Sequence, residues 1–392
     1  MFKGKLLLLV SYLIWSMPSY SIDIVWSGYG SIVGGQTVHE QVLPSGASTT
    51  FGVDPSLTGK QGATYRDVLS FSPDTMLALQ LNVDLKEGLS VTSQLTSRGG
   101  SDFNLEAEWL YVSYEVTPQL ILKAGKQRSP LYLFSDYLDV AYSYHWLRPP
   151  LNVYGEGVTT YQGISAAYNG YFGDFDYYFN IDIGSSHVKS TSLGELTLEN
   201  MVEFSSTFSN ESLTFRLAYT RAVAWLDESI LVGLELAPGQ PVPIFSNKDK
   251  PSGLSFSSVA LFYDPGKYFI GGEITVLGAL DNTPLQSGLT GTTFDSRDSW
   301  MLTSGIRIGK FTPHISLSER ITMLTGDVIE IFNDLESGSK SLIVGARYDF
   351  HPKAALKFDY TSRQDISSDL LQNISGKTKE VDVISAGIDF IF

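Results

Sequence analysis

Apolar and polar residues alternate with a period of two along almost the whole chain from Ile22 onward. Between Phe175 and Ile183, for example, the odd-numbered residues are aromatic or aliphatic, whereas Asp176 and Asp182 stand among the even-numbered ones. This alternation is typical of strands with one apolar and one polar face, and the 3.6-residue spacing of helices is almost absent. The pattern predicts an all-β protein with sixteen strands: Ile24–Thr37, Met76–Leu85, Leu89–Ser97, Leu105–Val116, Leu120–Gln127, Val158–Tyr168, Phe175–Ile183, Leu196–Phe208, Leu213–Val223, Leu254–Tyr263, Tyr268–Leu277, Trp300–Ile308, Phe311–Ile321, Ser341–Phe350, Ala354–Arg363 and Val381–Phe392.

The connections between these segments alternate between short and long. The short ones, such as Lys86 to Gly88 and Gly309 to Lys310, contain the Gly, Pro, Asn and Asp residues that tight turns need. The long ones are 38–75, 128–157, 224–253, 278–299, 322–340 and 364–380. The connections at one end of the sheet are therefore short, and those at the other end are long. This is typical of a transmembrane antiparallel β-barrel in an outer membrane, with short periplasmic turns and long extracellular loops. Short helical turns are expected within the loops, for example around Asp227 to Leu234.

The first 21 residues have the features of a secretory signal peptide. Lys3 and Lys5 precede an apolar stretch from Leu6 to Met17, and Ser19 and Ser21 offer small residues at the cleavage positions. The apolar stretch is shorter than the ~20 residues that a membrane-spanning helix needs. We therefore expect export of residues 22–392 as one barrel domain, with an uncleaved anchor as the alternative.

Composition excludes several classes of function. The 27 basic and 42 acidic residues give a formal charge of −15, which argues against a nucleic-acid partner. The chain has no cysteine, so disulfides, thiolate zinc sites, iron–sulfur clusters and cysteine nucleophiles are excluded. The five histidines do not show metal-ligand spacing, and no phosphate-binding glycine loop precedes a helix. No metal site and no cofactor are predicted.

The last predicted strand places apolar residues at alternate positions up to a terminal aromatic residue. Gly387, Phe390 and Phe392 fall in this segment. It resembles the C-terminal assembly signal of Gram-negative outer-membrane proteins, which implies a location in the outer membrane and the barrel assembly machinery as a partner. The alternative is an ordinary amphipathic edge strand.

The strand number and the glycine-rich segment Ser27–Gly35 resemble the 16-stranded porins. That resemblance implies passive diffusion of small hydrophilic solutes and ions through a water-filled barrel. It also implies a homotrimer surrounded by outer-membrane lipid and lipopolysaccharide. In this family the third extracellular loop folds into the barrel and constricts the pore.

The connection that would be the third extracellular loop, from Arg128 to Gly157, is unusually rich in aromatic and aliphatic residues. Standing in water, it would expose a large apolar patch. We therefore expect it to pack against the inner wall of the barrel. The alternative is a loop buried at a subunit contact or over the barrel mouth.

Alternation also predicts which charges face the lumen. The inward basic residues are Arg98, Lys123, Arg216, Arg307, Arg320, Arg347 and Lys357. The resemblance implies that bases on the wall face acids on the inserted loop. Asp136 and Asp139 are the candidate acids, and Arg98, Lys123 and Arg128 the candidate bases. Acids and bases both line the lumen, so neither cation nor anion preference follows.

Two other functions compete with a porin. One is a non-conducting barrel that acts as an adhesin or scaffold through its long loops. The other is an enzyme, because His314 and Ser316 resemble the His-x-Ser pair of outer-membrane phospholipases. The Asn-Gly that follows in that family is replaced by Leu317-Ser318, and His314 and Ser316 are predicted to face the lumen. We therefore predict a protein that is not an enzyme.

Overall fold

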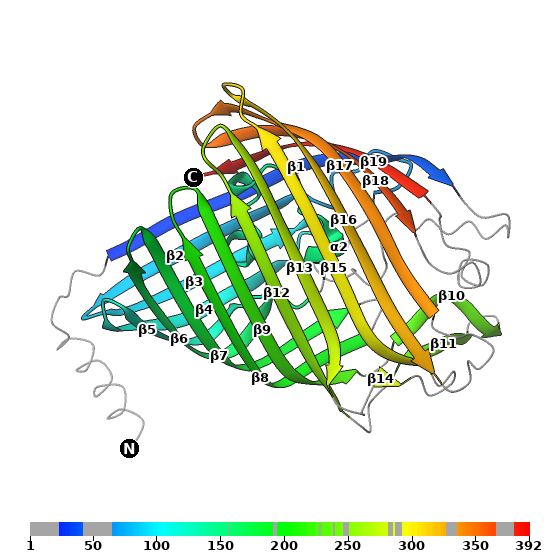
Figure 1. Cartoon of the computed structure of the whole chain (residues 1–392), viewed down its shortest axis with the longest axis horizontal. Helices are drawn as coiled ribbons and strands as arrows, with labels where there is room; N and C mark the ends of the chain where they lie inside the picture. Colours follow the sequence, from blue (N-terminus) through cyan, green and yellow to red (C-terminus); the bar gives the residue numbers. More distant parts are fainter. Residues whose placement is uncertain are drawn as a thin grey trace, which may run out of the picture.

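A computed structural model describes residues 23–41, 65–155, 157–190, 194–226, 229–237, 240–245, 251–280, 285–286, 292–326, 335–365 and 380–392. Sixteen strands form one closed antiparallel barrel (Figure 1). Each barrel strand pairs with its neighbours in the chain, and the last strand pairs with the first. The predicted signal peptide lies outside the described residues.

The barrel strands are β1 (Asp23–Gln41), β2 (Met76–Lys86), β3 (Leu89–Arg98), β4 (Leu105–Thr117), β5 (Leu120–Arg128), β6 (Thr160–Phe172), β7 (Phe175–Ser190), β8 (Gly194–Ser209), β9 (Leu213–Leu226), β12 (Ser252–Tyr263), β13 (Tyr268–Leu280), β15 (Thr292–Ile306), β16 (Phe311–Gly326), β17 (Leu335–His351), β18 (Ala354–Asp365) and β19 (Glu380–Ile391). Three further strands lie in long connections: β10 (Ser229–Ala237), β11 (Gln240–Phe245) and β14 (Leu285–Gln286). The helical segments are short: η2 (Gly99–Ser101), η3 (Ser135–Tyr137), η4 (Ala141–Ser143) and α2 (Leu151–Tyr154). None of the described helices has the length and apolar character to span a membrane.

All sixteen predicted strands are confirmed, and the main differences concern their ends. β7 continues to Ser190 and β15 begins at Thr292, each well beyond the apolar alternation that predicted it. These extensions are mostly polar, so hydrophobic patterning does not reveal them. The helical turn expected around Asp227 to Leu234 is wrong, because β10 occupies Ser229–Ala237 and pairs with β11. Ile230, Val232 and Leu234 alternate there, which favours a strand.

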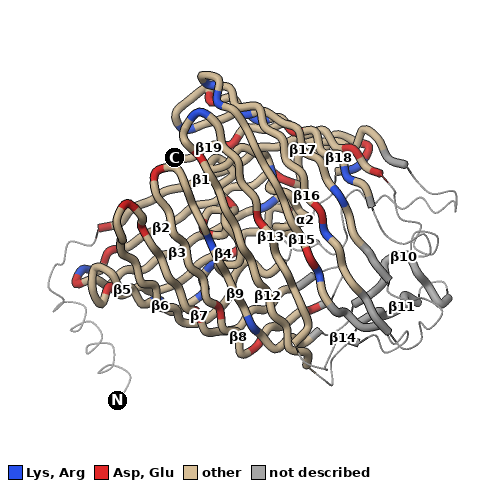
Figure 2. Tube along the Cα trace, viewed as in Figure 1, with Lys and Arg blue, Asp and Glu red and all other residues tan. Residues whose placement is uncertain are grey.

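The two faces of the barrel wall are reversed relative to a water-soluble barrel. On β13, Ile270 and Ile274 are exposed on the outer face, whereas Glu273 and Thr275 are buried on the inner face. On β16, Leu317 is exposed and Ser316 is buried in the same way. Most strand positions carry no charge (Figure 2). An apolar outer band and a polar interior fit a barrel surrounded by lipid.

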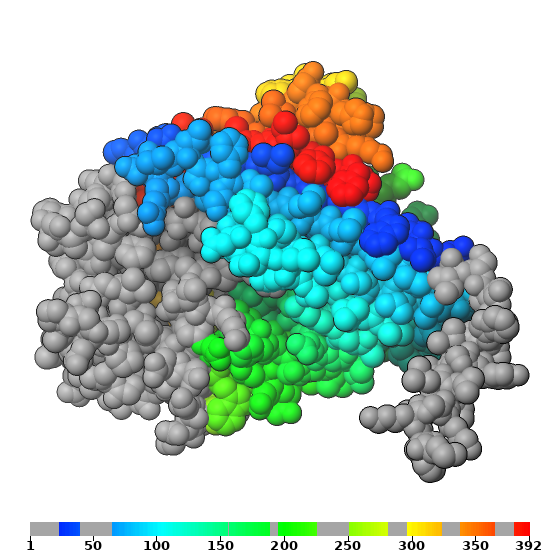
Figure 3. Space-filling view, turned by 180° about the vertical axis from the view of Figure 1, so that it is seen from behind, coloured from blue at the N-terminus to red at the C-terminus, as the bar shows by residue number. Residues whose placement is uncertain are grey.

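The barrel closes where β19 lies against β1, and in Figure 3 the red C-terminal residues adjoin the blue first strand. The backbone NH of Phe392 donates to the carbonyl of Gly28 (2.9 Å). The ring of Phe392 covers the outer side of Gly28 so closely that a Cβ there would overlap it. A Cβ on Gly30 would lie 2.7 Å from the ring of Phe390. Glycines on β1 therefore make room for the aromatic rings of β19.

Candidate functional site

Residues 129–159, which we call the inner loop, connect β5 to β6 and contain η3, η4 and α2. The inner loop contacts Arg98 of β3, Glu273 of β13 and Asp359 of β18. These strands lie on different sides of the barrel, and a single segment can reach all three only from inside (Figure 1). The inner loop therefore lies within the barrel.

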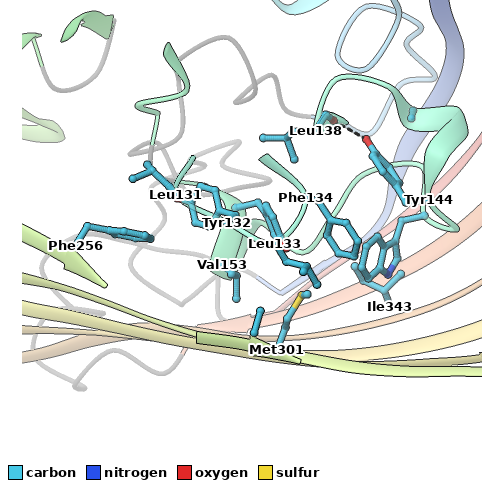
Figure 4. Packing of buried hydrophobic residues seen from close by; sticks show 14 residues of the cluster. Leu131, Tyr132, Leu133, Phe134, Leu138, Tyr144, Val153, Phe256, Met301 and Ile343 are labelled. Carbon is cyan, nitrogen blue, oxygen red and sulfur yellow. Dashed lines mark hydrogen bonds between the residues drawn. The ribbon is translucent and has the colours of Figure 1, made fainter. Parts of the chain in front are cut away.

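Apolar packing holds one side of the inner loop against the wall. Its buried side chains face inward-pointing residues of β12, β15 and β17 (Figure 4). The loop contributes Leu131, Tyr132, Leu133, Phe134, Leu138, Ala141, Tyr144, Trp146, Val153 and Tyr154, and the wall contributes Phe256, Ala260, Met301 and Ile343. Trp146 is fully buried, and its Nε1 donates to Ser316 Oγ (2.8 Å). The aromatic residues that predicted an inserted loop are thus shielded from water by the inner wall.

Basic residues of the wall donate to backbone carbonyls of the inner loop. Four of the seven bases predicted to face the lumen do so. The pairs are Arg216 with Pro130 (3.2 Å), Arg320 with Asn152 (2.9 Å) and Leu151 (2.7 Å), Arg347 with Tyr144 (2.9 Å) and Tyr142 (2.5 Å), and Lys357 with Ala141 and Trp146 (both 2.6 Å). Charged donors make stronger hydrogen bonds than neutral ones. These side chains therefore fix the position of the inner loop.

Acidic residues of the wall accept from the same loop. Glu273 accepts from the backbone NH of Leu133 (3.0 Å) and from the hydroxyl of Tyr154. Asp359 accepts from the backbone NH of Leu147 (2.8 Å). A third carboxylate, that of Glu203, accepts from Ser129 at the start of the loop. The strand pattern places these acids inside, but their partners lie 74 to 212 residues away in sequence, so strand alternation did not reveal this role.

Asp139, one of the two candidate acids, is paired with two arginines inside a buried cluster. Its Oδ2 bonds Arg128 and lies 3.1 Å from Nη2 of Arg98, which also contacts Glu108 at 3.4 Å. Burial alone would raise the pKa of Asp139, but the guanidinium groups of Arg128 and Arg98 hold that pKa below its usual range. The structure thus brings Asp139, Arg98 and Arg128 together as an anchor of the loop.

Asp136, the other candidate acid, has the opposite surroundings. Its side chain is 63% exposed, and its Oδ2 lies 3.5 Å from Nη1 of Arg216, which is buried behind it. Lys123 is placed apart from Asp139, with its Nζ 5.6 Å from the ring centroid of Tyr111 on β4. Asp136 and Lys123 are therefore the two candidates that lie outside the buried cluster of Asp139.

One predicted lumen base and the three assembly-signal residues lie away from the loop anchors. Arg307 directly follows β15 and pairs with Asp264 (2.6 Å) in the turn before β13, at the end of the barrel with short connections. Gly387, Phe390 and Phe392 lie on or directly after β19. The assembly-signal residues therefore belong to the closing strand pair and not to the lumen charges.

His314 and Ser316 do not form an accessible catalytic pair. They are 4% and 1% exposed, and His145 and Trp146 of the inner loop cover them. His314 Nε2 lies 3.3 Å from Oδ1 of Asp359, which also binds the loop backbone. A substrate could reach these groups only if the inner loop left the wall. Among the described residues, no group of three or more His, Asp or Glu is arranged to hold a metal ion.

Comparisons with known proteins agree on the fold. No protein-family model matches the chain, and no curated protein matches its sequence. Among solved structures, the outer membrane channel DcaP of Acinetobacter baumannii aligns at a TM-score of 0.59 and 10% identity, covering 96% of this chain and 99% of its own. An anion-selective porin from Comamonas acidovorans aligns at 0.56 and 11%, covering 95% and 100%. OmpT, an outer membrane protein of Vibrio cholerae in a trimer form, aligns at 0.54 and 10%, covering 95% and 100%. The resemblance predicted from the sequence is thus confirmed for the fold, which is that of outer-membrane porins.

Proposed function

We propose that this protein is an outer-membrane porin through which small hydrophilic solutes and ions diffuse passively. The proposal is supported by a closed barrel of sixteen strands with an apolar outer face and a polar inner face, inside which the inner loop is anchored to the wall. A barrel of sixteen strands is wide enough to leave an aqueous channel beside such a loop. Selection would then depend on the width and charge of the remaining passage.

The passage would run along the wall formed by β6 and β7. These two strands carry none of the loop anchors described for Arg98, Arg128, Glu203, Arg216, Glu273, Arg320, Arg347, Lys357 and Asp359. Asp136 on the loop and Lys123 on the wall would carry the charges of the constriction. Arg98, Arg128 and Asp139 would define its width, because they set where the loop lies.

The surroundings of the barrel follow from the same proposal. Residues 1–21 would direct export, and lipid and lipopolysaccharide would cover the apolar outer band. The barrel assembly machinery would recognise Gly387, Phe390 and Phe392, and three copies would form a homotrimer, which the trimer form of OmpT supports. The protein would not be an enzyme, because the only pair that suggested catalysis is covered by the inner loop.

Swelling of liposomes that contain the purified barrel tests passive diffusion. Isosmotic solutions of hydrophilic solutes of increasing size should give swelling rates that fall steeply with solute size. Protein-free liposomes are the control. Absence of swelling with the smallest solutes, from vesicles whose barrels are folded, would contradict the proposal.

The same assay evaluates the second candidate, a non-conducting barrel that acts as an adhesin or scaffold. The many anchors of the inner loop favour it, because a loop held this firmly could close the lumen. Folded barrels that permit no swelling would support this candidate.

A further inference from the structure

Nine tyrosines of the lumen and the inner loop fall into two groups by what their hydroxyls bind. In the first group, each hydroxyl donates to an acceptor within the protein. These tyrosines are Tyr29, Tyr65, Tyr142, Tyr144, Tyr154 and Tyr161. They are structural, because a phenol hydroxyl in a packed position needs a hydrogen-bond partner.

The second group consists of Tyr111 on β4, Tyr137 on the inner loop and Tyr178 on β7. Their hydroxyls make no hydrogen bond to any residue that the structure describes. Tyr137 follows Asp136 in the chain and is 37% exposed. Tyr178 lies within electrostatic range of Asp136 and of Tyr111. Tyr178 pairs in register with Thr207 of β8, whose Oγ1 accepts from Arg216, and Arg216 lies 3.5 Å from Asp136. Tyr137 and Tyr178 therefore both lie near the exposed carboxylate of Asp136.

Neighbouring side chains restrict two of these rings. Phe134 packs against Tyr137 edge-on, with ring centroids 5.6 Å apart and planes at 69°. Nζ of Lys123 lies 5.6 Å from the ring centroid of Tyr111. Rings that are already positioned lose little conformational entropy when a solute stacks on them.

The two carboxylates beside the rings have partners within the protein. Asp136 lies 3.5 Å from Arg216, and Asp182 on β7 accepts from Tyr161 and Asn180. On the adjacent wall, neutral side chains of β2, β3 and β4 bond to one another in three pairs: Gln94 to Gln80 (2.9 Å), Thr92 to Asn82 (2.9 Å) and Ser90 to Ser113 (2.7 Å). This part of the lumen therefore presents hydroxyl, amide and aromatic surfaces more than net charge.

We propose that Tyr111, Tyr137 and Tyr178, with Asp136, form a binding subsite for neutral polyhydroxylated solutes such as sugars. The inference rests on the proposed porin function and names the solute class of the same passage. A sugar ring has an apolar C–H face that packs on an aromatic ring, and hydroxyls that bind free phenol groups and a carboxylate. Apolar and aromatic surfaces with a few placed polar groups are typical of small-molecule sites.

Block of the ion current by maltotriose in a planar bilayer tests this subsite. Added maltotriose should reduce the potassium chloride current of the wild type with saturable concentration dependence. Tyr137→Ala and Tyr178→Ala should each weaken this block by about tenfold, as loss of one stacking contact predicts. Tyr137→Phe should retain most of it, because the ring remains. Tyr219→Ala is the matched control, since Tyr219 lies on the outer face of β9 and is 45% exposed.

Each result decides between the two proposals. Saturable block that the two alanine variants lose, and that a polyethylene glycol of similar size does not produce, supports the subsite. Normal conductance without saturable block, or block in both alanine variants that equals the block of the wild type, overturns the subsite but leaves the porin standing. Absence of conductance in folded protein contradicts the porin function itself.

Discussion

Two aspartates three residues apart on the inner loop have opposite surroundings. Asp139 is buried between Arg98 and Arg128, whereas the side chain of Asp136 is mostly exposed. Removing one partner of a buried ion pair costs about 3–5 kcal/mol, because the remaining charges lose their compensation. We therefore expect Asp139→Asn to destabilise the loop and lower the unfolding temperature of the barrel.

Asp136→Asn is the matched control and should leave the unfolding temperature almost unchanged. Thermal unfolding followed by circular dichroism measures both variants. Equal unfolding temperatures for Asp139→Asn and the wild type would contradict the anchoring role of Asp139.

His145 should make the docking of the inner loop sensitive to acid. Its ring is buried between Trp146 and Phe269, and its Nε2 bonds Thr303 Oγ1 (2.9 Å). Burial is the main reason why the pKa of His145 lies well below its usual 6.5. Positive groups that face the ring lower this pKa further: His314, Lys357, Arg307 and Arg347. The released loop therefore binds more protons than the docked loop below pH 6.5. Docking should weaken by up to about 1.4 kcal/mol for each pH unit below that value.

Current fluctuations of single channels between pH 7.5 and pH 5 measure this effect. The wild type should become noisier as the pH falls below 6.5, because the loop leaves the wall more often. His145→Phe keeps the ring but cannot titrate, so its noise should stay flat. The same pH profile for both proteins would refute the role of His145.

At the scale of elements, the closing strand pair depends on the glycines of β1. The rings of Phe392 and Phe390 lie over Gly28 and Gly30, where a Cβ would collide with them. Gly28→Val should displace the ring of Phe392 and cost about 1–3 kcal/mol, as overpacking does. Gly278→Val on β13 is the control, because a Cβ there meets nothing closer than 3.8 Å.

The temperature at which the folded band disappears on a detergent gel measures this cost. Gly28→Val should lose the band at a lower temperature than the wild type, and Gly278→Val should not. If both variants behave like the wild type, the aromatic rings contribute nothing to closure.

The strands and the inner loop could be predicted from the sequence because each has a local signal. Alternation identified sixteen strands and the inward face of Arg216, Arg320 and Lys357, and the aromatic content of residues 128–157 indicated a loop packed inside. The partners of these residues could not be predicted. Lys357, for example, donates to the carbonyl of Ala141, which is 216 residues away, and strand alternation carries no information about such a contact.

At the scale of the whole molecule, the wall presents apolar residues outward and polar residues inward, and the inner loop covers much of that polar surface. Many charged side chains of the lumen form hydrogen bonds or ion pairs with the inner loop. The solute would therefore meet fewer free charges than the count of 42 acidic and 27 basic residues implies. Weak ion selectivity follows, and a reversal potential near zero in a potassium chloride gradient would measure it. A large reversal potential of either sign would contradict this charge balance.

In the proposed porin, water and solutes pass beside the anchored inner loop. Single-channel recording of the purified protein in a planar bilayer tests this passage. Discrete, uniform steps of ionic current are expected each time a barrel inserts. A folded barrel that inserts into the bilayer and gives no current steps would contradict it.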